Sequence, residues 1–244
     1  LFYSELFAVN DYLDRDYAPI AVRAKKLVEH EAAALRQIAH VEANLSGPLS
    51  KPLVETAIKI VSGYAEYLRG DVVKLVSGAL DPALKKRFDA ANGALAQAAE
   101  KIAKTLKERE LPRAGESHVL GPDRYRRLLE LQEGLTTPLA EIERMAEDDL
   151  AANARAYAEL AKTTKVTRPA ADQLFAEAQK QVTTSRDFVI QKKLVTIPGE
   201  QKVTVQETPP YMRWNQAFLN APGAFEAEGT EALYYSTLPD PSWS

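Results

Sequence analysis

The chain has 244 residues, of which 45% are hydrophobic and 27% charged, with a formal net charge of −3 and no cysteine. The mild negative charge argues against nucleic acid or an anionic membrane surface as a partner, and no apolar run of about 18 residues is present to span a bilayer. The lack of cysteine excludes disulfides, thiolate metal sites and a cysteine nucleophile.

Residues 1–193 are predicted to be almost entirely helical, because they are rich in Ala, Leu, Glu, Lys and Arg. Helix starts are predicted where a proline can occupy the first turn, at Pro19, Pro52, Pro82, Pro122, Pro138 and Pro169. Asp81 stands directly before one of these prolines and is a favourable N-cap. Six or seven amphipathic helices with short links predict a mainly α fold, an antiparallel multi-helix bundle.

The dipeptide His30-Glu31 resembles the start of an H-E-x-x-H zinc motif. However, Ala34 stands where the second histidine belongs, and the next histidine is His40. Ten residues of helix advance about 15 Å along the axis, so these two imidazoles cannot hold one ion. The remaining histidine, His118, lies in a segment containing proline and glycine. We therefore predict no catalytic residue and no metal ligand in this chain.

Two clusters of charged residues are interpreted as solvated surface. The carboxylates between Glu141 and Asp149 lack the Glu-x-x-His pairs that a di-iron site needs. The basic residues Lys85, Lys86 and Arg87 have no aromatic platform or glycine loop beside them, and acidic residues interleave. No P-loop, dinucleotide-binding fingerprint or serine-hydrolase elbow occurs in the sequence.

Residues 194–244 differ in character and are predicted to form a second region, rich in strands and proline. VTIPGEQKVTVQE alternates β-branched and polar residues around Pro198-Gly199, which indicates two strands joined by a turn. Pro209-Pro210 interrupts regular pairing, and LYYST at 233–237 predicts a further strand. So few strands have no sufficient core of their own. This segment is therefore expected to pack on the bundle, residues 1–193, and on a part of the protein outside this chain.

The same segment is rich in aromatic residues: Tyr211, Trp214, Phe218, Phe225, Tyr234, Tyr235 and Trp243. Two interpretations stay open. In one, the rings pack an irregular segment over the bundle. In the other, they form the wall of a cleft in which an exposed strand edge pairs with an extended peptide. Tyr211, Tyr234 and Tyr235 are then the candidate substrate-wall residues, and the LYYST strand is the candidate edge.

The run LVTIPGEQKVTVQETPPYMRWNQAFLNAPGAF, the later EALYYSTLPDPSW and the upstream GPDRYRRLLELQEGLTTPLAEIERMAEDDLAA together resemble a bacterial family, domain of unknown function 885. The resemblance is most specific from Leu120 onward and is looser, as helices only, before it. Members of that family are predicted zinc peptidases whose H-E-x-x-H helix follows the proline-rich strand region. No residue of this chain matches that motif, so no catalytic or zinc-binding role is transferred to it.

The resemblance implies that the chain is the N-terminal helical portion of a zinc-dependent metallopeptidase, a hydrolase, and is inactive alone. No cofactor is expected in this chain, whereas zinc is expected in the full-length parent. The partners would be the remainder of that parent and a peptide substrate, with export to the periplasm or the medium. The alternative is a non-catalytic helical interaction or scaffold module with an aromatic-rich docking tail. A gene that continues past Ser244 into an H-E-x-x-H helix favours the first.

Overall fold

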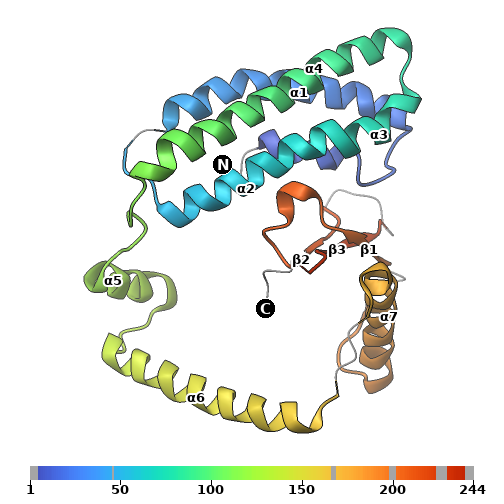
Figure 1. The fold of residues 1–244 in the computed structure, drawn as a ribbon. Coiled ribbons are helices and arrows are strands. Elements are labelled where there is room, and N and C mark those ends of the chain that lie inside the picture. The colour runs from blue at the N-terminus through green and yellow to red at the C-terminus, as the bar shows by residue number, and fades with distance from the viewer. Residues whose placement is uncertain (1–4, 46, 166–168, 198–201, 224–229, 240–244) are drawn as a thin grey trace. The chain divides into compact units, whose positions relative to one another are not determined.

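The computed structural model describes residues 5–45, 47–165, 169–197, 202–223 and 230–239 (Figure 1). The chain divides into two compact units. Unit 1 comprises Leu1–Gly115 and Ala170–Ser244, and unit 2 comprises Glu116–Pro169. The described residues are mainly helical with a small three-stranded sheet near the C-terminus, which confirms the predicted fold class. No helix in the described part combines the length and hydropathy needed to cross a membrane.

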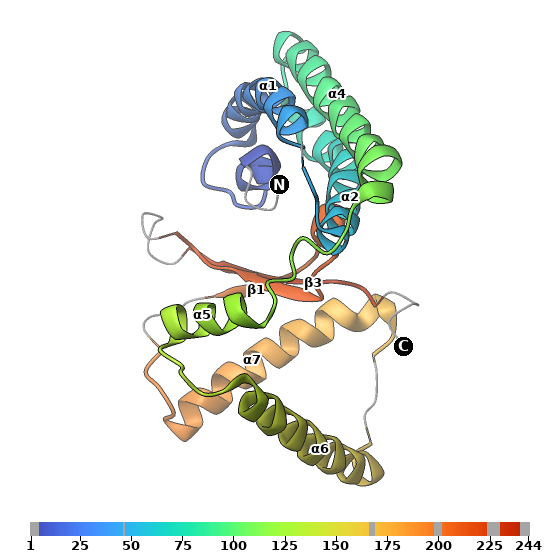
Figure 2. The ribbon, with the colours of Figure 1, turned by 90° about the vertical axis from the view of Figure 1, so that its left-hand side faces the viewer.

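Long helices that lie side by side form the bundle of unit 1 (Figures 1 and 2). α1 spans Ile20–Asn44, α2 spans Lys51–Tyr67 and α4 spans Pro82–Thr105. A π-helical turn, Leu68–Val72, joins α2 to the short α3, Val73–Val76, so that α2 and α3 form one continuous run. α4 packs against both α1 and α2.

Three long helices of unit 1 begin at or beside predicted prolines, whereas the helix predicted to begin at Pro169 begins as an α-helix only at Leu174. α1 follows Pro19, α2 has Pro52 in its first turn, and α4 begins at Pro82. The predicted N-cap is also confirmed, because the Asp81 side chain accepts a hydrogen bond of 2.8 Å from the backbone N–H of Leu84. Local sequence signals therefore place the starts of these helices.

The core of unit 1 is built from the apolar faces of these helices. Its fully buried side chains include Leu27, Val61, Tyr64, Leu68, Val72, Phe88, Leu95 and Leu106. Burying one side chain of this size contributes about 1.5–3 kcal/mol. Tyr211, from the C-terminal segment, belongs to the same core. That segment is thereby anchored to the bundle through a large aromatic side chain.

The sheet consists of β1 (Val203–Glu207), β2 (Ala217–Asn220) and β3 (Ala232–Ser236) in the order β1-β3-β2. β3 runs parallel to β1 and antiparallel to β2. The predicted LYYST strand is therefore confirmed as β3, shifted by one residue. The prediction that it is an exposed edge is wrong, because both sides of β3 are paired with described strands.

The predicted pair of strands around Pro198-Gly199 does not form as expected. Residues 194–197 are not in a strand, and the turn itself lies outside the described residues. The other edge of β1 instead faces Gln179 of α7 (Leu174–Lys192). The Gln179 amide donates to the Val203 carbonyl at 2.9 Å and accepts from the Val205 N–H at 2.8 Å. One side chain thus takes the place of a neighbouring strand.

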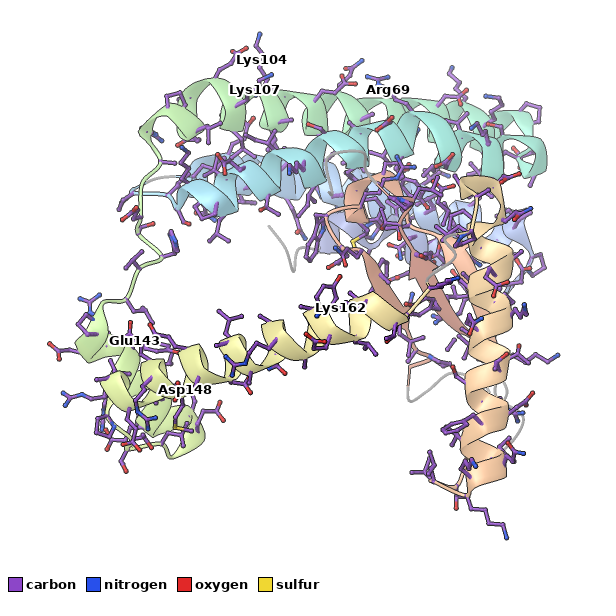
Figure 3. The ribbon with its side chains drawn as sticks, turned by 60° about the horizontal axis from the view of Figure 1, so that its bottom comes forward. Arg69, Lys104, Lys107, Glu143, Asp148 and Lys162 are labelled. Atoms are coloured by element: carbon purple, nitrogen blue, oxygen red, sulfur yellow. The ribbon has the colours of Figure 1, made fainter. Side chains whose placement is uncertain are left out.

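Unit 2 contains α5 (Pro122–Glu133) and α6 (Leu139–Thr163). Gly134 ends α5 with a positive φ of 66° and donates its N–H to the Glu130 carbonyl, as a C-terminal glycine cap does. The carboxylates predicted to form a solvated face of α6 are exposed, and Figure 3 labels Glu143 and Asp148 among them.

Candidate functional site

A polar pocket of about 280 Å³ lies within unit 1, where the segment before α1 and the end of α2 meet the sheet. We call it the junction pocket. Its lining residues are Asp14, Tyr67, Asp71, Leu75, Gln206, Glu207, Thr208, Pro209, Pro210, Arg213 and Tyr235. They come from both ends of the sequence of unit 1, so the pocket exists only when this unit is folded.

A hydrogen bond between Asp14 and Tyr235 joins two sides of the junction pocket. The Tyr235 hydroxyl donates to Asp14 Oδ2 at 2.5 Å, and the Asn10 amide donates to the same oxygen at 3.2 Å. Asp14 Oδ1 accepts no hydrogen bond from the residues that the structure describes. The carboxylate is therefore fixed in place through one oxygen and available through the other.

Burial shifts the proton affinities of these groups. Desolvation raises the pKa of Asp14 above its usual value, while the hydrogen bonds from Tyr235 and Asn10 oppose that rise. Desolvation and the nearby Asp14 charge both raise the pKa of Tyr235. Burial is the largest cause of the raised pKa of Tyr67, and the charges of Asp14 and Asp71 add to it. Both tyrosines thus keep their hydroxyl protons at neutral pH and can donate hydrogen bonds.

Negative charge in the junction pocket is only partly neutralised. Glu207 pairs with Arg213 at 3.0 Å, and Asp71 lies 3.5 Å from Lys74. Asp14 forms no ion pair with any described residue. The arrangement therefore favours a ligand group that donates hydrogen bonds and carries positive charge.

The three tyrosines predicted to form a substrate wall lie in three different places in the structure. Tyr235 lines the junction pocket, and its ring stacks on Phe218 at 4.7 Å between centroids. Tyr211 is 3% exposed and lies behind the pocket, with its ring 5.3 Å from that of Tyr67. Tyr234 directly precedes Tyr235 on β3, so its side chain points to the opposite face of the sheet. Their role toward a substrate stays a prediction.

The described residues do not fit a zinc site. His30 is half-buried on α1 and its ring lies 5.3 Å from that of Tyr12, whereas His40 is exposed and His118 belongs to unit 2. In the described part of the chain, no three or more His, Asp or Glu residues gather where they could hold a metal ion. No chemistry routed through zinc can be assigned to these residues.

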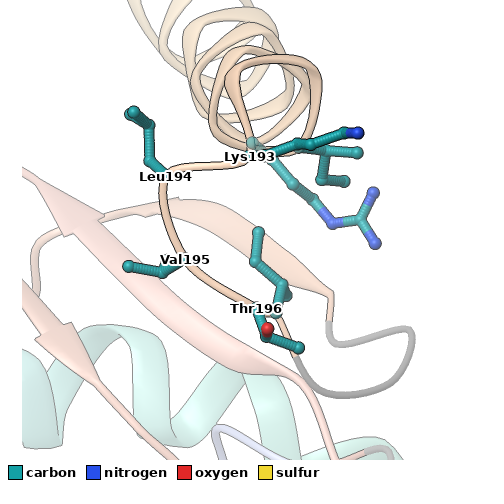
Figure 4. Close-up of a pocket in the computed structure, with 7 residues that line it drawn as sticks. Lys193, Leu194, Val195 and Thr196 are labelled. Carbon is teal, nitrogen blue, oxygen red and sulfur yellow. The ribbon is translucent and has the colours of Figure 1, made fainter.

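A larger hollow of about 620 Å³ lies at the C-terminal end of α7 (Figure 4). Its walls all come from one stretch of chain, residues 186–197, and its charged side chains are Arg186 and Lys193. No second element contributes to it. The junction pocket, in contrast, combines acidic, basic and hydroxyl groups from several elements, and it is the stronger candidate.

Sequence reasoning did not single out Tyr67 or Asp14, and it assigned no role to Arg213, although all three line the junction pocket. Tyr67 could have been noticed, because it follows Tyr64 by about one turn on the apolar face of α2. Asp14 stands in the polar stretch NDYLDRDY and carries no such signal. Arg213 follows Pro209-Pro210, where no periodicity indicates which way a side chain points.

Comparison with known proteins identifies a family for this chain but no individual relative. No curated protein and no solved structure showed significant similarity to the chain. A family model described as "Bacterial protein of unknown function (DUF885)" matches residues 2–243. Because this match extends over almost all of the sequence, the chain belongs to the DUF885 family of bacterial proteins.

Proposed function

We propose that this chain is the helical portion of a zinc-dependent metallopeptidase and that the junction pocket belongs to its substrate-binding side. The zinc ligands would come from a part of the protein outside residues 1–244. The observation that carries the proposal is the pocket itself, in which Asp14, Tyr67 and Tyr235 place polar groups between the bundle and the sheet. Membership of the family supports it, through the resemblance to predicted H-E-x-x-H peptidases.

In this proposal the residues of the chain bind and orient a peptide but do not carry out hydrolysis. The Asp14 carboxylate and the Tyr67 hydroxyl would bind polar groups of the substrate, and Tyr235 would hold Asp14 in place. The buried rings of Tyr211 and Tyr64 pack edge to face behind them, with centroids 5.7 Å apart. Such packing keeps the wall of the pocket rigid.

Zinc content and peptide hydrolysis test the proposal together. Purified residues 1–244 are expected to bind zinc weakly and to hydrolyse no peptide. The product of the complete gene is expected to contain zinc and to hydrolyse peptides, with activity lost on chelation and restored by zinc. Tight equimolar zinc binding by residues 1–244, accompanied by hydrolysis, would contradict the proposal. So would a complete gene product without zinc.

A non-catalytic helical interaction module is the second candidate. It is favoured by large apolar side chains that are exposed on α5 and α6, namely Leu131, Met145, Leu150, Tyr157 and Leu160. The aromatic tail supports it less, because Tyr211 and Tyr235 are buried. This candidate predicts that Leu150→Glu abolishes binding to a partner protein while the folded unit 1 is unchanged, and that the complete gene product hydrolyses nothing.

A further inference from the structure

Three side chains that line the junction pocket carry an oxygen without a hydrogen-bond partner among the described residues: Asp14, Tyr67 and Thr208. Tyr67 is only 4% exposed, yet its hydroxyl forms no hydrogen bond with any residue that the structure describes. Both hydrogen bonds to the Asp14 carboxylate reach Oδ2, which leaves Oδ1 free within the described part of the chain. A polar oxygen without a protein partner can accept a hydrogen bond from a ligand that reaches it. The Asp14 and Tyr67 oxygens are not fully enclosed, in contrast to the Thr208 hydroxyl, so a ligand in the pocket can reach these two.

The two groups lie close enough to act on one ligand. Asp14 and Asp71 both line the pocket, and their charges raise the pKa of the Tyr67 phenol. Asp14 and Tyr67 line one pocket of about 280 Å³, which is small enough for a single bound group to reach both. One small group that enters the pocket can contact both.

The charge balance selects a cation. Glu207 and Asp71 each form an ion pair with a basic residue, but Asp14 forms none with the described residues. An anionic ligand would meet three carboxylates that line the pocket, those of Asp14, Asp71 and Glu207, whereas Arg213 is the one basic residue among the described lining residues. A positively charged group with N–H donors could donate one hydrogen bond to Asp14 Oδ1 and another to the Tyr67 oxygen.

The geometry favours an organic cation over a metal ion. The described residues offer no set of three carboxylates or histidines at metal-binding spacing. The Asp14 carboxylate and the Tyr67 hydroxyl, in contrast, are oxygen acceptors that an ammonium group can use. An ammonium group has three donors that can be divided between a carboxylate and a hydroxyl. The pocket volume of about 280 Å³ admits such a group and a short stretch of the chain that bears it.

We propose that the junction pocket binds a primary alkylammonium group, which donates hydrogen bonds to Asp14 Oδ1 and the Tyr67 oxygen. This chemistry is shared by the α-amino end of a peptide and by the side chain of lysine. The inference rests on the proposed function in treating the pocket as a substrate site and deepens it by naming the group that the pocket recognises. Its test measures binding without hydrolysis, so its outcome is independent of any zinc site.

Titration of residues 1–244 with three small probes, followed by NMR, tests the ligand class. The probes are trialanine amide, its N-acetylated form and Nα-acetyl-lysine methylamide. Preferential binding of trialanine amide over its acetylated form supports the proposal and assigns the site to a peptide N-terminus. Preferential binding of the lysine derivative supports it and assigns the site to a lysine side chain. Equal binding of the acetylated trialanine, or no binding at roughly tens of millimolar, overturns it.

Variants of the two groups test the place of binding. Asp14→Asn is expected to weaken binding of the amine about tenfold or more, because a hydrogen bond to a charged group is lost. Tyr67→Phe keeps the ring and is expected to weaken binding several-fold, which decides the question if the first variant unfolds. The control is Asp123→Asn, an exposed carboxylate of unit 2 that does not line the pocket. Unchanged binding by a folded Tyr67→Phe variant would overturn the assignment.

Discussion

The Tyr235 hydroxyl donates a 2.5 Å hydrogen bond to Asp14 Oδ2, although the two residues are 221 positions apart in the sequence. The next residue, Arg15, donates to the Asn220 carbonyl at 2.9 Å and to its side-chain oxygen at 3.2 Å. Adjacent residues before α1 thus each hold a different strand, Asp14 holding β3 and Arg15 holding β2. The position of the sheet on the bundle depends on this short segment.

Tyr235→Phe tests the contribution of the first of these bonds. The variant keeps the ring stacked on Phe218 and removes only the hydroxyl. Because hydrogen bonds to charged groups contribute about 1.5–3 kcal/mol, the free energy of unfolding should fall by that amount at neutral pH. The pKa of Asp14 should rise further, because a hydrogen bond that lowers it is lost. Urea denaturation and carboxyl ¹³C titration measure the two effects.

Tyr234→Phe is the matched control, because Tyr234 lies on the opposite face of the same strand. Its effect on the pKa of Asp14 should be nil. A titration of Asp14 that is the same in both variants would show that the bond does not form in solution.

Helix starts could be predicted from this sequence because their causes are local. Asp81 caps α4 through a residue three positions later, and Pro19, Pro52 and Pro82 stand at or beside helix starts. The strand order β1-β3-β2 has no local cause. It depends on β3 pairing in parallel with a strand about thirty residues earlier, while Gln179 covers the far edge of β1. Alternation of residue types predicts strands but does not name their partners.

The junction pocket was predictable only in part, for the same reason. An aromatic-rich tail indicated Tyr211 and Tyr235, and both lie at or behind the pocket. The tail could not indicate Asp14, which contributes through a contact across almost the whole chain. Glu31 is a different case, because it stands between Leu27 and Leu35 on the apolar face of α1. Its place in that repeat could have indicated a buried acid, but Glu31 was considered only as part of a zinc motif.

Glu31→Gln tests this buried carboxyl. Glu31 is fully buried on α1, and neither carboxyl oxygen has a hydrogen-bond partner in the described structure. Burial raises its pKa from 4.5 to about 8. The folded protein therefore binds the Glu31 proton more tightly than the unfolded chain does. The contribution of this proton to the free energy of unfolding is fully present below pH 4.5 and is lost as pH rises to about 8. At about 1.4 kcal/mol per pH unit, roughly 4–5 kcal/mol is lost across this range.

Because the amide introduced by Glu31→Gln stays neutral, the variant should lack this loss and should unfold at higher urea concentration than wild type above pH 8. Glu29→Gln is the control, since Glu29 is exposed on the same helix and pairs with Lys26. Curves of stability against pH that run parallel for wild type and Glu31→Gln would show that the carboxyl is hydrated.

Gly63→Ala tests the close contact between α2 and the turn Pro210–Met212. A Cβ at position 63 would lie 2.6 Å from the Pro210 carbonyl oxygen, closer than unstrained atoms approach. Since the clash is with backbone, we expect overpacking to cost about 1–3 kcal/mol in the free energy of unfolding. Gly93→Ala in α4 is the matched control, because nothing lies within 4 Å of its Cβ position. That variant should gain up to about 1 kcal/mol from helix propensity. Equal stability of the two variants would mean that the turn does not pack on α2.

Gln179→Ala tests whether one side chain protects the edge of β1. The variant removes two hydrogen bonds to the strand. In one the Gln179 amide donates to the Val203 carbonyl, and in the other the Val205 N–H donates to the Gln179 side-chain oxygen. Hydrogen exchange of the Val205 amide should become faster, because that N–H then faces water, and the unfolding free energy should fall by about 1–3 kcal/mol. Gln181→Ala is the control, since among the described residues Gln181 bonds to Glu177 of its own helix and not to the sheet.

Gln179→Glu separates the two hydrogen bonds. A carboxylate can accept from the Val205 N–H but cannot donate to the Val203 carbonyl, so exchange at Val205 should stay slow while stability still falls. If the Val205 amide exchanges at the wild-type rate even in Gln179→Ala, another group must cover this edge. An edge that becomes open in that variant should also make the protein more prone to aggregate, because its unpaired backbone groups could pair with a second chain.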